Sequence, residues 1–342
     1  MKKNILLSTC LALMLCACNS AVNKLDIAKN NIHINGNLLF NGGLNSLDCL
    51  VGRPNGIIVS NSLLIFSDYY DGKLITVFDI NNNKCVGRFV IAGQGPNDAL
   101  PPLFILRFPQ KDMLYAFQDN TRHLYSFDIP GMDVQNKILF HEWPGVGSLG
   151  VLKDYYVAIG NWQDGRFGIF DRERNVLRTE GKYPFQGDGM DDPVKRYLKY
   201  QGHIISNPNG NYFAIGCGFS DNLEFYEVKE NETLLHKKYE SYDAKVQFPA
   251  GYRVQIEDDC IVSYEGGFGT DKYCYMLYSG KKFGERVSGG YNIIIFDWKG
   301  NYIKTLTSSV RIRSFCVDEN DSQIYAIVLT DDGEVEVMQF NI

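Results

Sequence analysis

The sequence lacks the short motifs that mark common metal and nucleophile sites. It contains no Cys-x-x-Cys pair, which argues against a structural zinc site, and no His-Glu-x-x-His of the zinc proteases. The Gly-x-Ser-x-Gly turn of serine hydrolases is absent around Ser148, and the five histidines are dispersed, without the i, i+4 spacing of a helix-borne metal pair. No enzyme of these classes is therefore expected.

Positive charge is also in short supply. The chain has 34 lysine and arginine residues against 40 acidic ones, a net charge of −6, which becomes −8 when Lys2 and Lys3 leave with the leader described below. A protein that binds nucleic acid needs a basic patch to neutralise phosphates. No nucleic-acid partner is therefore expected.

Small and aromatic residues are abundant. Of the 342 residues, 33 are glycine, 21 are tyrosine, 21 are phenylalanine and 45% are hydrophobic, so the chain is neither disordered nor collagenous. Glycine suits tight turns and aromatic residues suit strands, so many short strands are expected rather than helices. The length alone would allow two domains, but closed all-β architectures often run longer as one.

Residues 1–17 have the pattern of a lipoprotein signal peptide. A basic start precedes an apolar run from Ile5 to Leu15, which is too short to remain as a membrane-spanning helix, and a small residue precedes Cys18. The pattern resembles a bacterial lipobox, in which Cys18 is acylated and becomes the N-terminus; an ordinary signal peptide with an incidental cysteine is the alternative. Two or three acyl chains, at about 0.8 kcal/mol per buried methylene, would anchor the protein at a membrane.

The residues after Cys18 indicate which membrane the lipoprotein is expected to reach. Asn19 does not resemble the aspartate that retains Gram-negative lipoproteins at the inner membrane, so the resemblance favours the outer membrane, facing either the periplasm or the cell exterior. Residues 18–31 are interpreted as the lipidated cysteine and a polar tether, and residues 32–342 as one folded domain.

Six cysteines remain once Cys10, Cys16 and Cys18 are set aside. They are Cys49, Cys85, Cys217, Cys260, Cys274 and Cys316. An even number in an oxidising compartment permits disulfides, but most of these residues lie in apolar, strand-like stretches, where a free cysteine packs as a small hydrophobic residue. Mainly free thiols are expected. If one disulfide forms, Cys260 and Cys274 are the candidates, because an antiparallel hairpin would bring those two runs together.

A strand that ends in an aromatic residue, usually followed by an acidic one, recurs six times. The six aromatic markers are Phe78, Phe127, Phe170, Phe225, Phe296 and Phe340. Four of the five intervals between them lie between 43 and 55 residues, near the length of a propeller blade, and the longer fourth interval contains the loop-like residues 279–290. A β-sandwich with a second β domain is the alternative, but it does not explain the repeat.

Each repeat is expected to form a four-stranded antiparallel blade. Around the first marker, four strand-like runs cover residues 56–60, 63–66, 74–78 and 85–91, joined by Asp-Gly and Asn-rich turns. The last repeat supplies only three runs. Residues 32–40 alternate like a strand without a partner, so they are predicted to pair with the last blade and close the ring of an all-β, six-bladed propeller.

Three turn signatures carry a family resemblance. Residues 206–214 resemble a Ser-Pro-Asp-Gly-Lys turn with Asn209 in place of the aspartate, residues 318–326 are a looser copy, and residues 93–98 resemble a Gly-x-Gly-Pro-Gly-Glu stretch between blades one and two, with both final positions changed. The chain thus resembles the TolB-like six-bladed propeller lipoproteins of Gram-negative anaerobes over residues 32–342. These signatures specify fold better than function.

Two further segments have patterns whose structure has to be interpreted, a glycine-rich stretch and a helical one. Gly145 begins a Gly-x-Gly-x-x-Gly stretch, but strand-like residues follow it instead of the helix that a dinucleotide site requires, so a connecting loop is predicted. Asp192 and Pro193 begin the one stretch with helical character, a short helix or lid over one face. Such an interruption of a meander more often serves recognition than stability.

The candidate binding residues follow apolar runs and are expected to face a central funnel or its loops. They are Asp68, Tyr69, Asp119, Asn161, Trp162, Phe219, Tyr264 and Glu265. Turn capping is the alternative role for the carboxylates and the amide. No cofactor is expected, although propeller hydrolases of the lactonase type hold calcium in the axial channel with scattered carboxylates and amides, so calcium is left open.

The leading functional hypothesis is a non-enzymatic binding or scaffolding lipoprotein that recognises a protein, peptide or glycan. Its basis is a closed, anchored, mildly acidic fold with aromatic loops and no evident catalytic motif. A calcium-dependent hydrolase or lyase using the axial channel is the alternative, and a purely structural envelope component is the third. Fold alone does not decide among them, because propellers host binding and catalysis alike.

Overall fold

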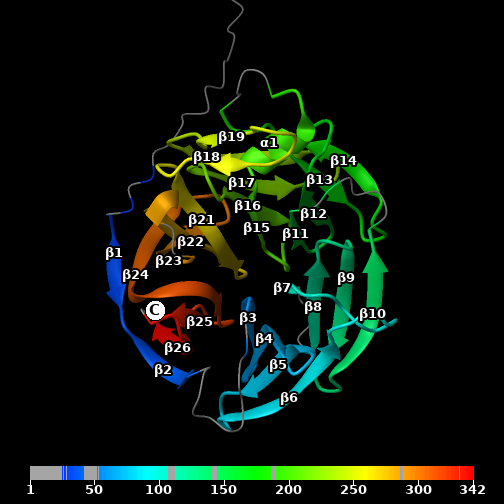
Figure 1. Ribbon diagram of the computed structural model, residues 1–342, viewed down its shortest axis with the longest axis vertical. Helices are drawn as coiled ribbons and strands as arrows, with labels where there is room; N and C mark the ends of the chain where they lie inside the picture. Colours follow the sequence, from blue (N-terminus) through cyan, green and yellow to red (C-terminus); the bar gives the residue numbers. More distant parts are fainter. Residues whose placement is uncertain are drawn as a thin grey trace, which may run out of the picture.

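A computed structural model shows a ring of β-sheets around a central axis (Figure 1). It describes residues 25, 27, 29–41, 52, 54–106, 112–140, 145, 147–185, 190–285, 288–330 and 332–342. The predicted signal peptide, Cys18 and Cys49 lie outside the described residues.

The first four blades are four-stranded antiparallel meanders, each formed by consecutive strands. Blades one and two contain β3 (Gly56–Ser60), β4 (Leu63–Tyr70), β5 (Lys73–Asp79), β6 (Lys84–Ile91), β7 (Phe104–Leu106), β8 (Met113–Gln118), β9 (His123–Asp128) and β10 (Asp133–Leu139). Blades three and four contain β11 (Ser148–Val151), β12 (Tyr156–Ile159), β13 (Phe167–Phe170), β14 (Val176–Glu180), β15 (Gly202–Ser206), β16 (Tyr212–Cys217), β17 (Asn222–Val228) and β18 (Thr233–Glu240).

Blades five and six share one long strand, β24 (Tyr302–Val317). Its residues 302–307 pair with β23 as the fourth strand of blade five, and its residues 311–317 pair with β25 as the first strand of blade six. The remaining strands of the two blades are β21 (Ile261–Gly269), β22 (Tyr273–Lys282), β23 (Gly290–Asp297), β25 (Gln323–Leu329) and β26 (Val335–Asn341). With β24 divided in this way, the ring has the six predicted blades.

The N-terminal segment closes the ring. β2 (Gly36–Asn41) pairs antiparallel with β26, with Gly36 opposite Phe340, and supplies the missing fourth strand of blade six as predicted. The prediction was wrong for the residues just before it, because β1 (Asn31–Ile34) runs parallel to β24 at the rim of blade five. One N-terminal segment thus fastens two blades and covers strand edges that would invite aggregation.

The hydrophobic core lies between blades. Each of six buried clusters among the described residues joins two neighbouring blades, and together they pass around the ring. Alternation along β23 shows how: Ile293 and Ile295 face blade six, whereas Ile294 and Phe296 face blade four. Both faces of such a strand are buried, so its sequence is a continuous run of hydrophobic residues.

All six aromatic markers lie on the third strand of their blades and are buried. The ring of Phe225 lies 5.1 Å from that of Phe296 in the next blade. The repeat found in the sequence is therefore the third-strand packing position of a propeller.

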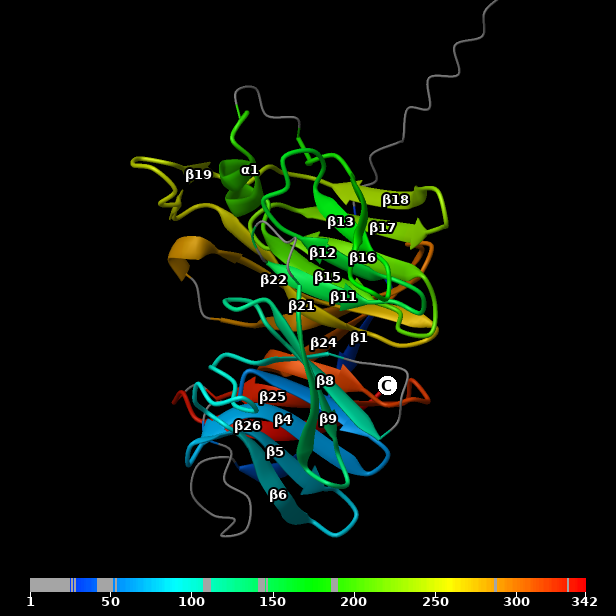
Figure 2. The same cartoon turned by 90° about the vertical axis from the view of Figure 1, so that its right-hand side faces the viewer.

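The meander places its connections on two faces. One face carries the connections between first and second strands and between third and fourth strands, and we call it the turn face. The opposite face, which we call the loop face, carries the connections between second and third strands and between blades. Figure 2 shows α1 (Pro193–Lys199) and β19 (Val246–Gln247) projecting from the same side of the ring, the loop face. β20 (Gln255–Ile256) pairs with β19, and η1 (Phe283–Glu285) follows β22 on this face.

Aspartates cap the turns of the turn face. Asp297 accepts hydrogen bonds from the backbone N–H groups of Lys299 and Asn301 and from the Asn301 side chain, at 2.8–2.9 Å. Asp79 and Asp171 make the same kinds of bond with the residues that follow them. In these three blades the acidic residue of the repeat is therefore the cap of the turn after the third strand.

The helix α1 begins where its sequence predicts. The Asp192 carboxylate accepts hydrogen bonds from the backbone N–H groups of Val194 and Lys195, at 2.9 and 3.4 Å, and Pro193 occupies the first turn. No helix in the described part of the chain has the length and apolar character needed to cross a membrane.

The candidate disulfide between Cys260 and Cys274 does not form in this structure. Cys260 and Cys274 are both free and buried, as are Cys217 and Cys316, and Cys85 is free and half-buried. Cys274 pairs with Gly269 near one end of the β21–β22 hairpin, whereas Cys260 precedes β21 at the other end. Nine residues of strand, at about 3.3 Å each, far exceed the separation that a disulfide allows.

Candidate functional site

The axial channel contains a cavity of ≈ 490 Å³. The first strand of every blade contributes to its wall, namely β3, β7, β11, β15, β21 and the second half of β24. Five of these strands, all except β24, end their sheets, so their edges facing the axis have no strand partner within the described residues. This size is typical of ligand-binding pockets.

Aromatic side chains from several blades line the cavity. They are Phe104, Phe117, Tyr197, Phe219, Tyr264, Phe268 and Phe315. Polar groups come from several strands, with Ser148 on β11 and Ser314 on β24 among them. Polar and apolar surface contribute comparably to the wall, which favours a ligand that has both an apolar body and hydrogen-bonding groups.

Two opposite charges lie in this wall. Among the described lining residues, Arg313 on β24 is the one arginine or lysine and Glu265 on β21 is the one carboxylate. Arg313 donates a hydrogen bond of 3.4 Å to the side-chain oxygen of Asn55, which precedes β3. Both charged side chains are partly buried, so each would interact more strongly with a ligand than a fully exposed charge.

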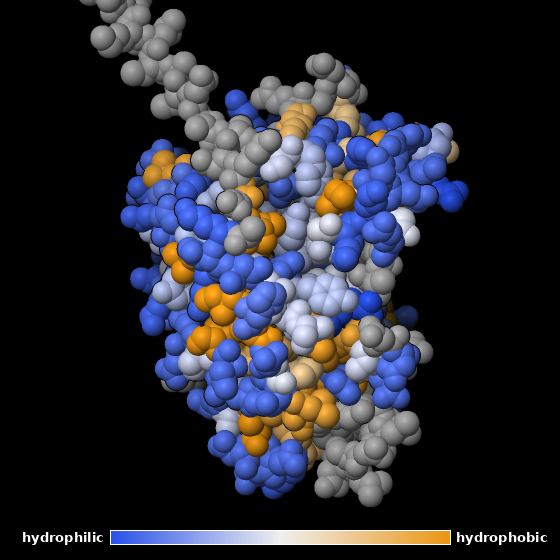
Figure 3. Space-filling model, turned by 90° about the vertical axis from the view of Figure 1, so that its left-hand side faces the viewer, coloured by the Kyte–Doolittle hydropathy of each residue, from blue (hydrophilic) through white to orange (hydrophobic). Residues whose placement is uncertain are grey.

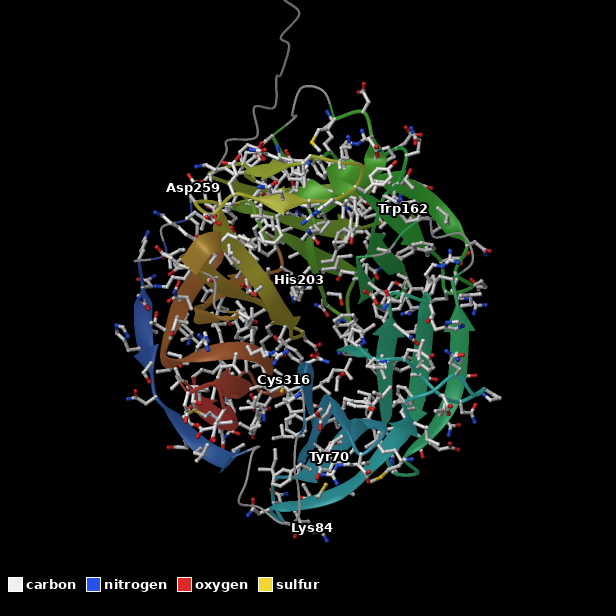
Figure 4. The ribbon with its side chains drawn as sticks, viewed as in Figure 1. Tyr70, Lys84, Trp162, His203, Asp259 and Cys316 are labelled. Carbon is white, nitrogen blue, oxygen red and sulfur yellow. The ribbon has the colours of Figure 1, made fainter. Side chains whose placement is uncertain are left out.

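His203 stands on the first strand of blade four and faces the channel. Figure 4 shows it near the centre of the ring, whereas Trp162 lies within the wall of blade three. The His203 side chain is reached by solvent inside the cavity but is enclosed by protein, and this desolvation lowers its pKa below the ordinary value of 6.5. His203 is therefore neutral at pH 7 and can donate or accept a hydrogen bond.

The helix α1 brings Tyr197 to the channel mouth. Burial, with a smaller contribution from the negative charge of Asp119, raises the pKa of Tyr197 to about 12. The Tyr197 hydroxyl packs against Gly147, where an added Cβ atom would lie only 2.3 Å from it. The second glycine of the Gly-x-Gly-x-x-Gly stretch thus allows a close approach of helix and strand, and β11 follows it as predicted.

A buried polar network supports the wall behind Tyr264. The Tyr264 hydroxyl donates a 3.3 Å hydrogen bond to Asp221, and its ring contacts that of Tyr278 at 5.5 Å. Burial raises the pKa of Asp221 above its ordinary value, and burial with the nearby Asp221 charge raises that of Tyr264 well above 10. These groups fix the orientation of Tyr264.

The structure brings three of the eight predicted binding residues to the cavity, Phe219, Tyr264 and Glu265. The other five are absent from its described wall. Asp68 is buried in β4 and accepts bonds from the Gly52 N–H at 3.0 Å and from Thr76 at 3.4 Å, and Tyr69 is exposed next to it on the loop face.

Most of the other predicted binding residues cap turns or pack within a blade instead of lining the cavity. Asp119 accepts a bond from the Asn120 N–H in the turn after β8, so turn capping, the alternative role, fits it. Trp162 is buried, donates to the Ala158 carbonyl at 3.1 Å and packs against Phe170. Asn161, directly before Trp162, lies close to Gly145 in the neighbouring connection.

The sequence reasoning missed Arg313, His203, Tyr197 and Phe104. Arg313 lies in an apolar run that reads as an ordinary strand, and its role depends on that strand being the first of its blade. Tyr197 had a usable signal, because the predicted helix at Pro193 was already expected to lie over one face. Among the described residues, no three histidine, cysteine, aspartate or glutamate side chains are grouped as potential metal ligands.

Known structures share this fold at low sequence identity. A protein of Bacteroides fragilis inferred to be exported matches with a TM-score of 0.58 and 12% identity over 91% of this chain and 98% of its own. The β-propeller domain of Swd1 from Myceliophthora thermophila matches with a TM-score of 0.52 and 9% identity over 89% and 99% of the two chains. The WD40 repeats of RRP9 match with a TM-score of 0.52 and 8% identity over 90% and 97%. These likenesses show the fold alone.

Sequence comparison identifies the family. A search of curated protein sequences finds no match to this chain. The family described as TolB-like 6-blade propeller-like matches residues 42–320, which is most of the chain and spans β3 to β24. The family and the six-bladed ring agree with the resemblance seen in the turn signatures. The chain belongs to the TolB-like six-bladed propeller family.

Proposed function

We propose that this protein is a binding lipoprotein of the outer membrane that takes a protein, peptide or glycan partner at the mouth of its axial channel. The axial cavity carries the proposal, because all six blades contribute to it and its wall combines aromatic rings with Arg313, Glu265 and His203. A propeller that served only as a structural spacer would have no need of such a wall. We propose no catalysis.

The anchor is part of the proposal. Lipidation of Cys18 would leave residues 19–24 as a tether, because Leu25 and Ile27 already pack against the buried cluster between blades four and five; six residues span at most about 20 Å when fully extended. β1 lies at the rim of blade five, so the ring would stay close to the membrane surface. Export is consistent with the Bacteroides fragilis protein of the same fold.

Site-specific photo-crosslinking in living cells tests the binding role. A benzophenone amino acid replaces Phe219 at the channel mouth, and the matched control replaces Val86, which is 43% exposed on the outer strand β6. Ligand binding at the mouth predicts adducts from position 219 that position 86 does not give. Identical adduct patterns from the two positions would contradict the proposal.

Two further measurements separate the alternatives. Cys18→Ser should move the protein from the membrane fraction to the soluble fraction, and unchanged membrane retention would refute the lipid anchor. Elemental analysis of the purified mature protein tests the calcium-dependent enzyme. A stoichiometric divalent ion that is lost together with a hydrolytic or lyase activity would replace the binding proposal with catalysis.

A further inference from the structure

A line of exposed apolar side chains crosses the loop face from the edge of blade one to the channel mouth. Ile91 ends the outermost strand β6 and is 52% exposed, Leu100 lies in the connection to blade two and is 36% exposed, and Phe104 begins β7 and is 43% exposed. We call these three residues the apolar stripe. Single exposed apolar residues are common, but three leading into a cavity indicate a binding surface.

Two hydrogen bonds hold the stripe over blade one. The connection turns back at Ile91, whose carbonyl accepts a 3.1 Å hydrogen bond from the Ala99 N–H. At its inner end, the Leu103 carbonyl accepts a hydrogen bond from the buried Ser67 hydroxyl on β4. The stripe therefore follows the blade from its fourth strand inward, and Phe104 already belongs to the cavity wall.

The inner end of the stripe adjoins Arg313. β7 lies beside β3, because a Cβ atom added to Gly56 would lie 3.2 Å from Ile105. Asn55, the residue just before β3, accepts the hydrogen bond from Arg313, which belongs to blade six on the other side of blade one. Phe104, Asn55 and Arg313 thus follow one another around the mouth from blades two, one and six.

Arg313 has the charge and geometry to bind a carboxylate. Within the described part of the chain no carboxylate pairs with it, and its hydrogen bond goes to a neutral amide. A guanidinium group binds carboxylates through two parallel hydrogen bonds, and partial burial strengthens such a pair. His203 is neutral at pH 7, so it neither adds to this charge nor offsets it.

We propose that the apolar stripe and Arg313 bind an extended peptide of a partner protein, with apolar side chains on the stripe and a carboxylate at Arg313. The inference rests on the proposed function and names the ligand class. Aliphatic Ile91 and Leu100 complement apolar side chains better than sugar hydroxyls, which favours a peptide over an acidic glycan.

The dimensions agree with a short segment. Three strand spacings of about 4.8 Å separate β6 from β3, which gives a path of about 14 Å. An extended peptide rises about 3.3 Å per residue, so four to five residues cover this path and one more reaches the channel. A hexapeptide is therefore the appropriate probe.

Binding of labelled hexapeptides to the mature full-length protein tests the inference. The probes are Leu-Ser-Leu-Ser-Leu-Phe with a free C-terminal carboxylate, the same peptide as its amide, and an amide whose last residue is aspartate. Fluorescence anisotropy should show that at least one of the two carboxylate peptides binds about tenfold or more tightly than the neutral amide, because a charge-assisted bond is added. The two carboxylate peptides distinguish a terminal from a side-chain carboxylate.

Matched variants assign the effect to named residues. Arg313→Gln should remove the preference for the carboxylate, whereas Arg311→Gln, on the same strand but outside the cavity wall, should retain it. Phe104→Ser should weaken all the peptides alike, whereas Leu177→Ser, equally exposed on the outer strand β14, should not. Thermal unfolding of each variant establishes that it is folded, and Arg313→Lys, which keeps the charge, should retain part of the preference.

Several outcomes would overturn the inference. Equal affinity for acid and amide peptides, or a preference that survives Arg313→Gln, would exclude the carboxylate site. Binding of trigalacturonate in place of the peptides would assign the site to an acidic glycan. If no peptide binds but crosslinking from position 219 still gives adducts, this inference fails while the proposed function stands; if both experiments fail, the proposed function fails too.

Discussion

The two faces of the ring are built by different rules. On the turn face, short connections recur from blade to blade, and aspartates such as Asp79, Asp171 and Asp297 cap them through the same bonds. On the loop face, one connection forms α1, another forms the β19–β20 hairpin, and a third carries the apolar stripe. Repetition therefore marks the face that supports the fold, and its absence marks the face that surrounds the cavity mouth.

One loop-face residue nevertheless stabilises the fold. Arg166, in the connection before β13 of blade three, is buried and forms an ion pair with Glu224 on β17 of blade four. It also donates a 3.1 Å hydrogen bond to Asn222, and the Tyr226 hydroxyl donates one of 2.8 Å to Glu224. This pair joins adjacent blades beneath the surface and is the sharpest exception to the division between the faces.

Removing the Glu224 charge is expected to have the largest effect on stability. Glu224→Gln leaves the Arg166 guanidinium buried without its counter-charge, which should reduce the free energy of unfolding by about 3–5 kcal/mol. Urea unfolding followed by tryptophan fluorescence measures this. The control is Asp259→Asn, which breaks the exposed Lys245–Asp259 pair (Asp259 is labelled in Figure 4) and should change stability little. Equal losses in both variants would show that the Arg166 pair is no exception.

A turn-face cap is expected to have the next largest effect. Asp297→Ala removes three hydrogen bonds from the turn after β23, and by analogy with helix caps it should reduce the free energy of unfolding by about 0.5–2 kcal/mol. Asp297→Asn keeps an acceptor oxygen and should recover part of the loss. If Asp297→Ala were neutral in urea unfolding, the caps would be a consequence of the fold and not a support for it.

Acidification should affect the turn-face caps at low pH. Hydrogen bonds from Asn82 lower the pKa of Asp79, and bonds from Gln323 and Ser322 lower that of Asp318 despite the opposing effect of its partial burial. Their stabilisation is present above the ordinary value of 3.8 and is lost as the pH falls through the lower folded-state values. An Asp79→Asn, Asp318→Asn double variant should lose less stability than wild type between pH 4 and pH 2. Parallel curves would contradict this prediction.

The difference between the faces also explains what the sequence could predict. The pair Phe296–Asp297 is recognisable because one residue packs between blades and the next caps a local turn, so both requirements repeat with the blade. Asp68 and Glu265 both follow an apolar run, yet only Glu265 lies on a first strand and reaches the channel. The order of strands within a blade decides this, and no local pattern records it.

Ring closure shows which strand pairings could be predicted from the sequence and which could not. The alternation of residues 32–40 predicted a strand and the short last repeat predicted its partner, so the pairing of β2 with β26 could be foreseen. The parallel pairing of β1 with β24 could not, because it depends on β24 continuing from blade five into blade six. Arg313 was overlooked for a related reason, since it lies on that second half of β24.

Figure 3 presents the rim of the ring, which differs from both faces. It looks onto the side that carries β1 and β24, where hydrophobic residues are interleaved with hydrophilic ones. The exposed apolar residues Ile32, Leu38 and Ile303 lie on three outer strands. None of these three residues lines the cavity, whereas the stripe ends at Phe104 in the cavity wall.

The smallest effect is expected at the cavity itself, from His203→Gln. At pH 8 the substitution should change the free energy of unfolding by less than about 0.5 kcal/mol, because His203 is neutral there and faces the channel. Below pH 6.5 the unfolded chain takes up a proton before the folded one, so wild type loses stability on acidification and the variant should lose less. Urea unfolding of wild type and His203→Gln at pH 8 and at pH 5.5 measures both the effect of the substitution at pH 8 and the loss of stability on acidification. A large loss at pH 8 would show that the channel wall is as rigidly built as the turn face, and the division between the two faces would then fail at the site where ligand binding is proposed.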